Sequence, residues 1–396
     1  MALQSNNMAF AGSSVTSVSG RRRALAGFLL SGFLLALLGA ILPAWGYHRE
    51  EHYVAVGNFF LSLAIGIVAA TGIARPILRR RGLGFLLVFG CSLCCVSLCY
   101  LALVGSPGLR ALGLFALGVG AGLVNLALFH AISTSYQSDP AGTVNRGGIW
   151  YGSGCLLAAL LVWSTLYVPQ VLLFMAVVPA IFAIVYWRTS YTSPAPGAHP
   201  TLKQAFRDFR SFGAVLFALL LFFQSGNEWS IAGWLPVFLL HRVRDLSPKG
   251  ALVILALYWF FLMTGRLVAV AILPRVRHTR LLMGSVVTAI FGCLMLWLTD
   301  NAFGAGMAVF FLGAGFASIY PLVAEAIGRR FPYYHPGFFN GIFSFALVGG
   351  LIAPATLGYA ASEWGVGVVI GIPLMGMFLV MALLVVIWLE SKVTGR

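Results

Sequence analysis

The chain has 396 residues, of which 60% are hydrophobic and only 9% are charged. Soluble domains of this length do not have that composition, whereas an all-α integral membrane protein with many spanning helices does. A transmembrane β-barrel would show weakly alternating segments in place of continuous apolar runs. The formal net charge is +15, but the basic residues lie at the ends of the apolar runs, where they orient a membrane protein. We therefore expect a lipid bilayer and no nucleic acid as the partner.

Twelve apolar runs are long enough to cross a bilayer as helices. The first follows residues 1–20, whose Ser-, Asn- and Gly-rich composition predicts a disordered cytoplasmic tail. The fifth and sixth runs are separated only by Val168-Pro169-Gln170. We expect the spans at residues 25–47, 53–75, 83–104, 110–133, 148–168, 170–187, 212–240, 250–273, 281–299, 302–327, 337–359 and 365–389.

Lysine and arginine are distributed unequally between the two sets of connecting segments. Most of them fall in the segments on the same side as the N-terminus. Because cytoplasmic segments of membrane proteins carry the excess of positive charge, both termini are predicted to lie in the cytoplasm. The expected location is the plasma or inner membrane, as a multi-pass protein.

The longest connecting segment, residues 189–211, divides the chain into two halves that resemble each other. It is predicted to be a cytoplasmic linker between an N-terminal six-helix bundle at 21–188 and a C-terminal six-helix bundle at 212–390. Two parallel six-helix repeats around a site at the bilayer midplane form one large transporter architecture. The similarity rests on three alignments at nearly constant offset: 59–81 with 258–280, 118–132 with 313–327, and 154–159 with 349–354.

These features resemble the major facilitator superfamily over the whole of residues 21–390. In that family the loop between the second and third spans reads approximately Gly-x-x-x-Asp-Arg/Lys-x-Gly-Arg-Arg. The loop here runs from Gly72 to Gly82 and keeps the basic cluster, while Pro76 stands in the approximate place of the acid. The resemblance therefore implies the fold, of twelve transmembrane helices in two pseudo-symmetric halves, but not the salt bridge that the acid usually makes near this loop.

Within the superfamily, two segments of the C-terminal half are similar to the fucose-permease-like sugar transporters. They are Gly226-Asn227-Glu228 followed by Trp234-Leu235-Pro236, and Met263-Thr264-Gly265-Arg266 in the eighth span. The similarity does not identify the substrate.

Glu228 is the one acidic residue that falls near the centre of a spanning run. An ionisable residue at that depth is costly and marks a functional site by default. A carboxyl there is able to gain and lose a proton during a working cycle, so Glu228 is a candidate for proton coupling or substrate binding. The alternative is a protonated acid that is hydrogen-bonded within the bundle.

Gln224 and Asn227 fall at helical spacing from Glu228, which places all three on one face of a helix. Their amides both donate and accept hydrogen bonds, which suits the hydroxyl groups of a sugar. Hydrogen bonding between helices is the alternative role. Asn125, in the fourth span, and Tyr320, its repeat partner in the tenth, are further candidates for the cavity wall.

Glu325 lies near the cytoplasmic end of the tenth span, four residues before Arg329. Arg266 enters the same half of the membrane from the eighth span. Such residues form gate pairs that break when one side opens, and we expect Arg266, Glu325 and Arg329 to form a cytoplasmic gate. The resemblance implies the same, because the family has comparable Glu and Arg residues there. A plain structural ion pair is the alternative.

No catalytic constellation is present in the sequence. It contains neither a nucleophile with a plausible base nor a phosphate-binding Gly-Lys-Ser/Thr loop. No cofactor is expected, and no group of His, Cys and acidic residues has convincing metal-ligand spacing. The six cysteines lie in apolar runs, where packing is the favoured role. A metal site is the alternative for the four that share one helical face: Cys91, Cys94, Cys95 and Cys99.

The sequence therefore predicts a secondary active transporter that is not an enzyme and that functions as a single chain. We expect it to take up a sugar or similar polar metabolite together with protons, by alternating access. An exporter of drugs or amphipathic metabolites is the first alternative, because aromatic residues make up 14% of the chain and central charges are few. A membrane receptor or scaffold that kept the fold without transport is a second alternative, from another class.

Overall fold

The computed structural model describes residues 18–49, 52–138, 140–168, 170–191, 209, 211–273, 275–331 and 341–394. Most of the predicted tail and linker lies outside the described residues, although the first helix already begins at Val18. No strand occurs in these ranges. The helices are α1 (Val18–Ile41), α2 (Tyr53–Leu103), α3 (Pro107–Ser138), α4 (Pro140–Thr165), α5 (Val171–Trp187), α7 (Phe212–Arg242), α8 (Pro248–Ile272), α9 (His278–Leu298), α10 (Ala302–Arg330), α11 (Ile342–Trp364) and α12 (Val368–Thr394).

The predicted spans correspond to these helices. The second and third spans both lie in α2, which is interrupted at Gly82, where φ is 81°. Glycine adopts this left-handed conformation without steric cost, so the chain reverses there. Ten of the described helices are long and apolar enough to cross a membrane, and α5 is a shorter apolar helix. The predicted all-helical fold class is confirmed.

The ends of several helices differ from the predicted spans. α1 ends at Ile41, before Pro43 and the positive-φ Gly46, although hydrophobic residues continue to 47. α4 begins at Pro140, because polar residues that were expected in a loop continue the helix. α11 begins at Ile342, after Gly341 with φ 71°.

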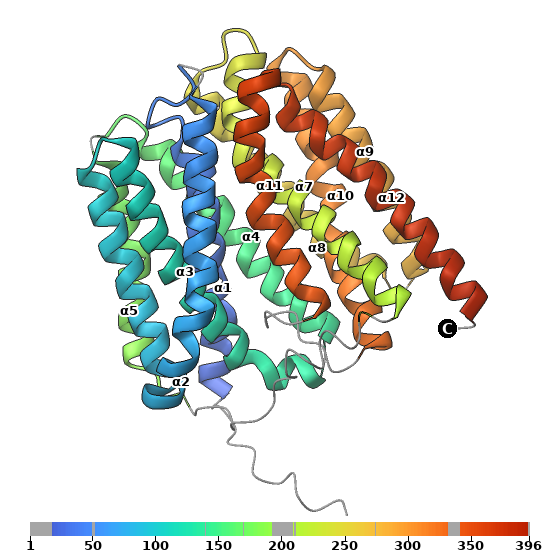
Figure 1. Cartoon of the computed structure of the whole chain (residues 1–396), viewed down its shortest axis with the longest axis horizontal. Helices are drawn as coiled ribbons and strands as arrows, with labels where there is room; N and C mark the ends of the chain where they lie inside the picture. The colour runs from blue at the N-terminus through green and yellow to red at the C-terminus, as the bar shows by residue number, and fades with distance from the viewer. Residues whose placement is uncertain are drawn as a thin grey trace, which may run out of the picture.

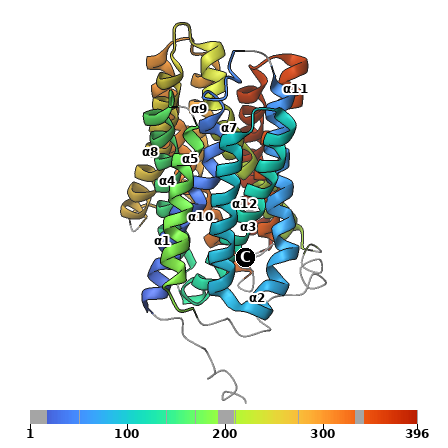
Figure 2. The same cartoon turned by 90° about the vertical axis from the view of Figure 1, so that its left-hand side faces the viewer.

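The helices form two bundles that lie side by side (Figure 1). In the first, α1 packs on α4, and α2 packs on α3 and α5. In the second, α7 packs on α11 and α12, and α10 packs on α8 and α9. The bundles meet along α4 with α8, α2 with α11, and α1 with α7. Figure 2 shows the helices running side by side from one end of the molecule to the other.

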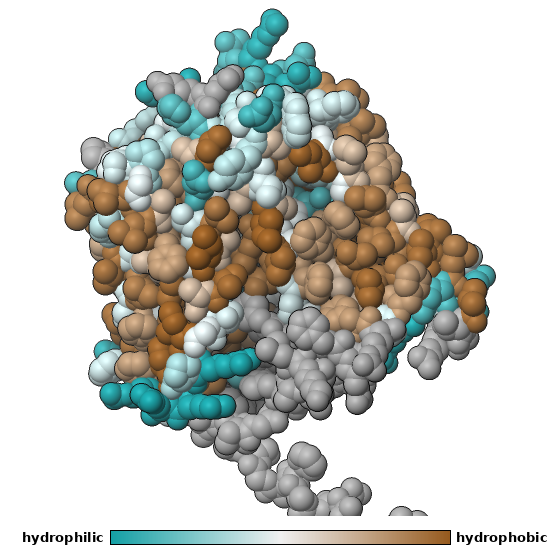
Figure 3. All heavy atoms as spheres, in the orientation of Figure 1, coloured by the Kyte–Doolittle hydropathy of each residue, from teal (hydrophilic) through white to brown (hydrophobic). Residues whose placement is uncertain are grey.

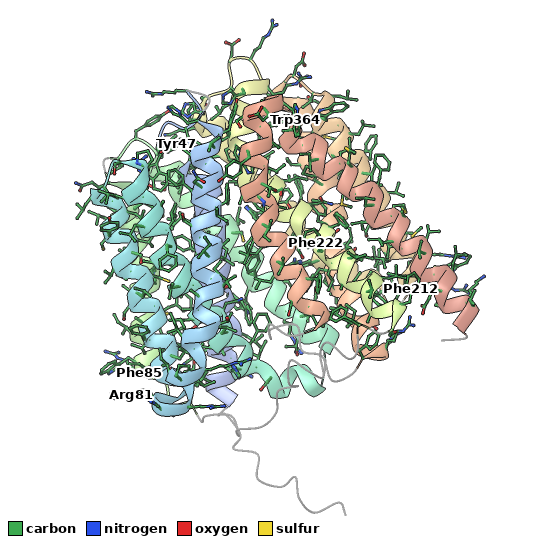
Figure 4. The ribbon with its side chains drawn as sticks, viewed as in Figure 1. Tyr47, Arg81, Phe85, Phe212, Phe222 and Trp364 are labelled. Atoms are coloured by element: carbon green, nitrogen blue, oxygen red, sulfur yellow. The ribbon has the colours of Figure 1, made fainter. Side chains whose placement is uncertain are left out.

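The two ends of the molecule differ in composition. Hydrophobic residues cover the middle of the face in Figure 3, and hydrophilic residues gather toward its upper and lower edges. Figure 4 places Arg81, Phe85 and Phe212 at the lower end, and Tyr47 and Trp364 at the upper end. Arg330 packs against Gly213, next to Phe212. We name the end with Arg79, Arg80, Arg81, Arg329 and Arg330 the arginine-rich end, and the other the opposite end.

Candidate functional site

A cavity of about 220 Å³ lies between the two bundles. Helices α1, α2, α3 and α4 contribute to its wall from one bundle, and α7, α8, α10 and α11 from the other. The lining begins near the middle of the helices and extends toward the arginine-rich end, as far as Ile132, Thr143 and Phe343.

The bundles are in close contact at the opposite end. Within the C-terminal bundle, the indole Nε1 of Trp234 on α7 donates a hydrogen bond to the carbonyl oxygen of Pro354 on α11, at 2.9 Å, and so orients the ring that meets the other bundle. The Trp234 ring also stacks near Phe60 of α2, with centroids 6.0 Å apart. Glycines let the backbones approach: a β-carbon added at Gly57 would lie 2.7 Å from the carbonyl oxygen of Ala355. The cavity is therefore closed at this end.

Glu228 lines the cavity from the middle of α7, and only 7% of its surface is exposed. Ser225 and Trp229 line the cavity with it. These three positions lie on one face because they are separated by three and four residues, about one helical turn. α7 is continuous from Phe212 to Arg242, so the glycines and the proline within it do not interrupt the site.

Arg266 of α8 lines the same cavity and is 6% exposed. Its Nη1 donates a hydrogen bond of 2.6 Å to the carbonyl oxygen of Gly148 on α4, in the other bundle. A β-carbon at Gly148 would overlap the guanidinium group, so a larger residue there would displace the end of the Arg266 side chain. Arg266 also acts electrostatically on Glu228, although the two form no direct ion pair among the described contacts. The cavity thus holds one carboxyl group and one guanidinium group, both contributed by the C-terminal bundle.

The comparisons with known proteins agree with this architecture. A family model described as Major Facilitator Superfamily matches residues 147–354, which is more than half of the chain. The chain belongs to the major facilitator superfamily. An uncharacterized MFS-type transporter of Yersinia pestis is 22% identical over 352 residues, which cover 87% of this chain and 89% of that protein.

Solved structures show the same fold. The nucleoside transporter NupG superposes with a TM-score of 0.70 at 14% identity, over 92% of this chain and 99% of that one. The fucose:proton symporter FucP of E. coli superposes with a TM-score of 0.60 at 13% identity, over 93% and 98%. As a member of the superfamily, this protein is a multi-pass membrane transporter, and its cavity lies between the two helical bundles.

Two of the predicted residues, Asn125 and Tyr320, line the cavity of this superfamily member. The Oδ1 of Asn125 on α3 accepts a hydrogen bond from the Ser31 hydroxyl of α1, at 3.1 Å. The Tyr320 ring on α10 lies 6.4 Å from that of Phe343 on α11. Their roles in substrate binding stay predictions.

Asn227 and Gln224 are not among the cavity-lining residues of this structure, and their roles in substrate binding stay predictions. The side chain of Asn227 packs against Gly376 of α12, in the space that a β-carbon at Gly376 would fill. Gln224 is completely buried, and its side chain lies close enough to the Glu228 carboxyl to interact with it. Both are covered because α7 packs closely on α11 and α12.

Arg266 and Glu325 do not pair with each other among the described contacts, and the cytoplasmic gate stays a prediction. Both residues belong to the C-terminal bundle, but Arg266 reaches across to α4 whereas Glu325 pairs within its own bundle. Glu325 contacts Arg329, one turn later in α10, and its Oε2 lies 3.4 Å from His278 Nε2 at the start of α9. These contacts fit a structural ion-pair cluster at the arginine-rich end.

Further residues of the cavity wall have only a weak signal or none in the sequence. Tyr151 of α4 and Trp229 of α7 are aromatic residues that could stack on a sugar ring, although packing is the favoured role of any single one, and Thr143 and Gly148 lie outside the recognised motifs. No sequence signal distinguishes them before the helices are placed. Within the described residues, no group of three His, Cys, Asp or Glu could hold a metal ion, and the six cysteines are free thiols.

Proposed function

We propose that this transporter moves a small polar metabolite, such as a sugar, together with a proton that binds Glu228. The observation that carries the proposal is the position of Glu228, the one acid among the cavity-lining residues that the structure describes. A carboxyl at this depth is retained only where it has a function, because burying it is costly. The fold shared with a nucleoside transporter and a fucose:proton symporter supports a solute of that class.

The cavity wall supports a small solute with several hydroxyl groups. The cavity volume of about 220 Å³ is smaller than that of pockets for drug-sized molecules, which hold roughly 300–1,000 Å³. Asn125, Tyr151, Ser225 and Tyr320 supply side chains that donate and accept hydrogen bonds. Trp229 supplies an aromatic face on which a sugar ring is able to stack.

We place the arginine-rich end in the cytoplasm, because basic segments of membrane proteins stay on that side. Both termini and the linker at 189–211 are then cytoplasmic, and the inner or plasma membrane is the proposed location. The structure then corresponds to a state whose cavity faces inward. In alternating access the bundles at 21–188 and 212–390 rock against each other, so that the opposite end opens as the arginine-rich end closes. One chain contains the whole path.

Protonation of Glu228 would remove the negative charge that the cavity holds near Arg266. The ionised carboxylate balances the charge of Arg266, and protonation removes that balance. Because Arg266 bonds to Gly148 on the other bundle, a change in the charge next to Arg266 acts on a contact between the two bundles. This is the link by which proton binding would bias the alternating-access equilibrium.

Uptake into proteoliposomes under an imposed pH gradient tests the proposal. The probes are labelled hexoses and nucleosides, beside a lipophilic cation. The expected result is accumulation that collapses when a protonophore is added. Glu228→Gln should abolish uphill accumulation while downhill exchange continues, because a neutral amide cannot carry the proton. Glu363→Gln, at an exposed acid near the end of α11, is the matched control. Unchanged uphill uptake by Glu228→Gln would contradict the coupling role.

Export of amphipathic compounds is the second candidate, and the composition of the cavity wall favours it. Most lining residues are apolar, among them Phe28, Phe129, Leu347 and Phe343. Such walls bind lipophilic molecules without specific hydrogen bonds. Movement of the lipophilic cation against its gradient, with hexoses and nucleosides not transported, would establish this function instead.

A further inference from the structure

We infer that the transported solute carries a carboxylate, which binds the guanidinium of Arg266 while Glu228 is protonated. This inference rests on the proton coupling proposed above and specifies the chemical class of the solute. It predicts a monoanionic hydroxy acid or sugar acid as the substrate, and disfavours a neutral sugar.

The first observation is the charge balance of the cavity. Glu228 and Arg266 are the two charged side chains among the described lining residues, and both are more than nine-tenths buried. The other titratable groups that face Glu228 are Tyr151 and Cys155 of α4 and Tyr258 of α8, and Tyr320 of α10 lines the same cavity. Phenol and thiol groups are neutral at physiological pH. The charge that compensates Arg266 therefore comes from Glu228 alone.

The second observation is that Arg266 keeps hydrogen-bond donors without partners. A guanidinium has five N–H donors. The structure shows one hydrogen bond from Arg266, which its Nη1 donates to Gly148, and the buried Nε has no partner among the described residues. A planar guanidinium with free donors at a cavity wall is suited to bind a carboxylate with two parallel hydrogen bonds.

Together these observations couple the proton to the anion. Protonation of Glu228 would leave Arg266 as an uncompensated buried cation, which is strongly unfavourable. A carboxylate that enters the cavity restores neutrality and satisfies the free donors. If Glu228 is ionised, its charge repels the same carboxylate. Proton and carboxylate should therefore bind together and leave together.

This coupling determines how transport responds to the membrane potential. One proton and one carboxylate carry no net charge, so their movement responds to a pH gradient and not to the potential. Symport of a neutral sugar with one proton moves a positive charge and is accelerated by an inside-negative potential. The potential therefore distinguishes the two substrate classes.

The experiment compares carboxylates with matched neutral solutes in proteoliposomes. The labelled pairs are glucuronate with glucose, gluconate with sorbitol, and lactate with propane-1,2-diol, each with a pH gradient and with or without a potassium diffusion potential. We expect uptake of a carboxylate member that requires the pH gradient and does not change with the potential. Arg266→Gln should weaken its apparent affinity by about 10- to 100-fold, as the loss of charge-assisted hydrogen bonds predicts. Arg275→Gln, at the exposed turn after α8, should leave it unchanged.

Two further variants distinguish a loss of carboxylate binding from a loss of folding. Arg266→Lys keeps the charge but not the planar pair of donors, so it should retain carboxylate preference at lower affinity. Gly148→Ala should displace the guanidinium without removing it, because a β-carbon there overlaps Arg266. Thermal stabilisation of purified protein by each carboxylate at acidic pH measures binding without transport.

The outcomes separate this inference from the proposed function. Proton-driven uptake of the neutral members, accelerated by the potential and unaffected by Arg266→Gln, would overturn the carboxylate site and leave the proton coupling intact. Uptake of a carboxylate that depends on Arg266 but not on pH would overturn the coupling through Glu228. Absence of any response to every carboxylate, in both transport and thermal stabilisation, would also overturn the inference.

Discussion

The two ends of the molecule are held together by different kinds of contact. At the opposite end the contacts join the two bundles: Gly57 of α2 lies against Gly358 of α11, and Gly39 of α1 lies against Gly233 of α7. At the arginine-rich end the ion pairs lie within one bundle. Arg330 pairs with Glu390 at 2.6 Å, inside the C-terminal bundle.

This difference indicates which end decides the state of the transporter. Close packing depends steeply on distance and is lost as soon as the bundles separate. Ion pairs inside a bundle are the same whether the bundles are together or apart. The population of the state that is closed at the opposite end should therefore be set by packing there and by the hydrogen bond from Arg266 to Gly148.

The largest expected effect comes from Gly57→Leu. The new side chain has no room between α2 and α11, because its β-carbon alone would lie 2.7 Å from the carbonyl oxygen of Ala355. Overpacking costs about 1–3 kcal/mol, so the ratio of molecules closed to molecules open at the opposite end should fall roughly 5- to 150-fold. Distances between spin labels at Val54→Cys and Trp364→Cys, two exposed sites near this end, should become longer.

Gly72→Leu is the control for this variant. Gly72 lies on the same helix, and a β-carbon there meets no atom within 4 Å. Both variants are labelled in a background with Cys95 and Cys99, the partly exposed cysteines, replaced by serine. Equal distance distributions for the two glycine variants would show that packing at this end does not select the state.

A smaller effect is expected from Trp234→Phe. The change removes part of the ring that packs on Phe60 of the other bundle. It also removes the hydrogen bond from Nε1 to Pro354, which lies within the C-terminal bundle and so acts on the orientation of the ring, not directly on the contact between the bundles. The label distances should shift in the same direction as for Gly57→Leu, and the rate of exchange should change. Trp187→Phe, at a site that is 79% exposed, should leave both unchanged.

The fold could be predicted from the sequence because long apolar runs mark the segments that lie within the membrane. The two-fold repeat and the basic segments then restricted the arrangement of the spans. The errors lie at helix ends, where hydropathy and helical structure differ. The segment before residue 148 is polar and still helical in α4, and the segment after Ile41 is apolar but contains Pro43 and turns.

The site was accessible only in part. Glu228 could be recognised by its position near the centre of an apolar run, and Asn125 and Tyr320 by the alignment of the two halves. Both features can be seen in the sequence without knowing how the helices pack. Periodicity placed Asn227 near Glu228 on the helix but could not show that α12 covers it. Likewise, the level of Arg266 in the membrane does not show that its side chain crosses to α4.

The smallest effect is expected where the two bundles share a side-chain hydrogen bond at the opposite end. The Tyr359 hydroxyl of α11 donates to Asn58 Oδ1 of α2 at 2.5 Å, and Tyr359 is exposed. An exposed neutral hydrogen bond contributes about 0.5–1.5 kcal/mol at most, since water replaces the lost partner.

Tyr359→Phe should therefore change the label distances little, and less than Trp234→Phe does. A double-mutant cycle with Asn58→Ala isolates the hydrogen bond from other effects of the two changes. A coupling energy below about 1 kcal/mol is expected. A larger value would show that directional bonding, in addition to the fit of glycines and aromatic rings, holds the two bundles together at this end. The opposite end would then differ from the arginine-rich end in its polar contacts between the bundles as well as in its packing.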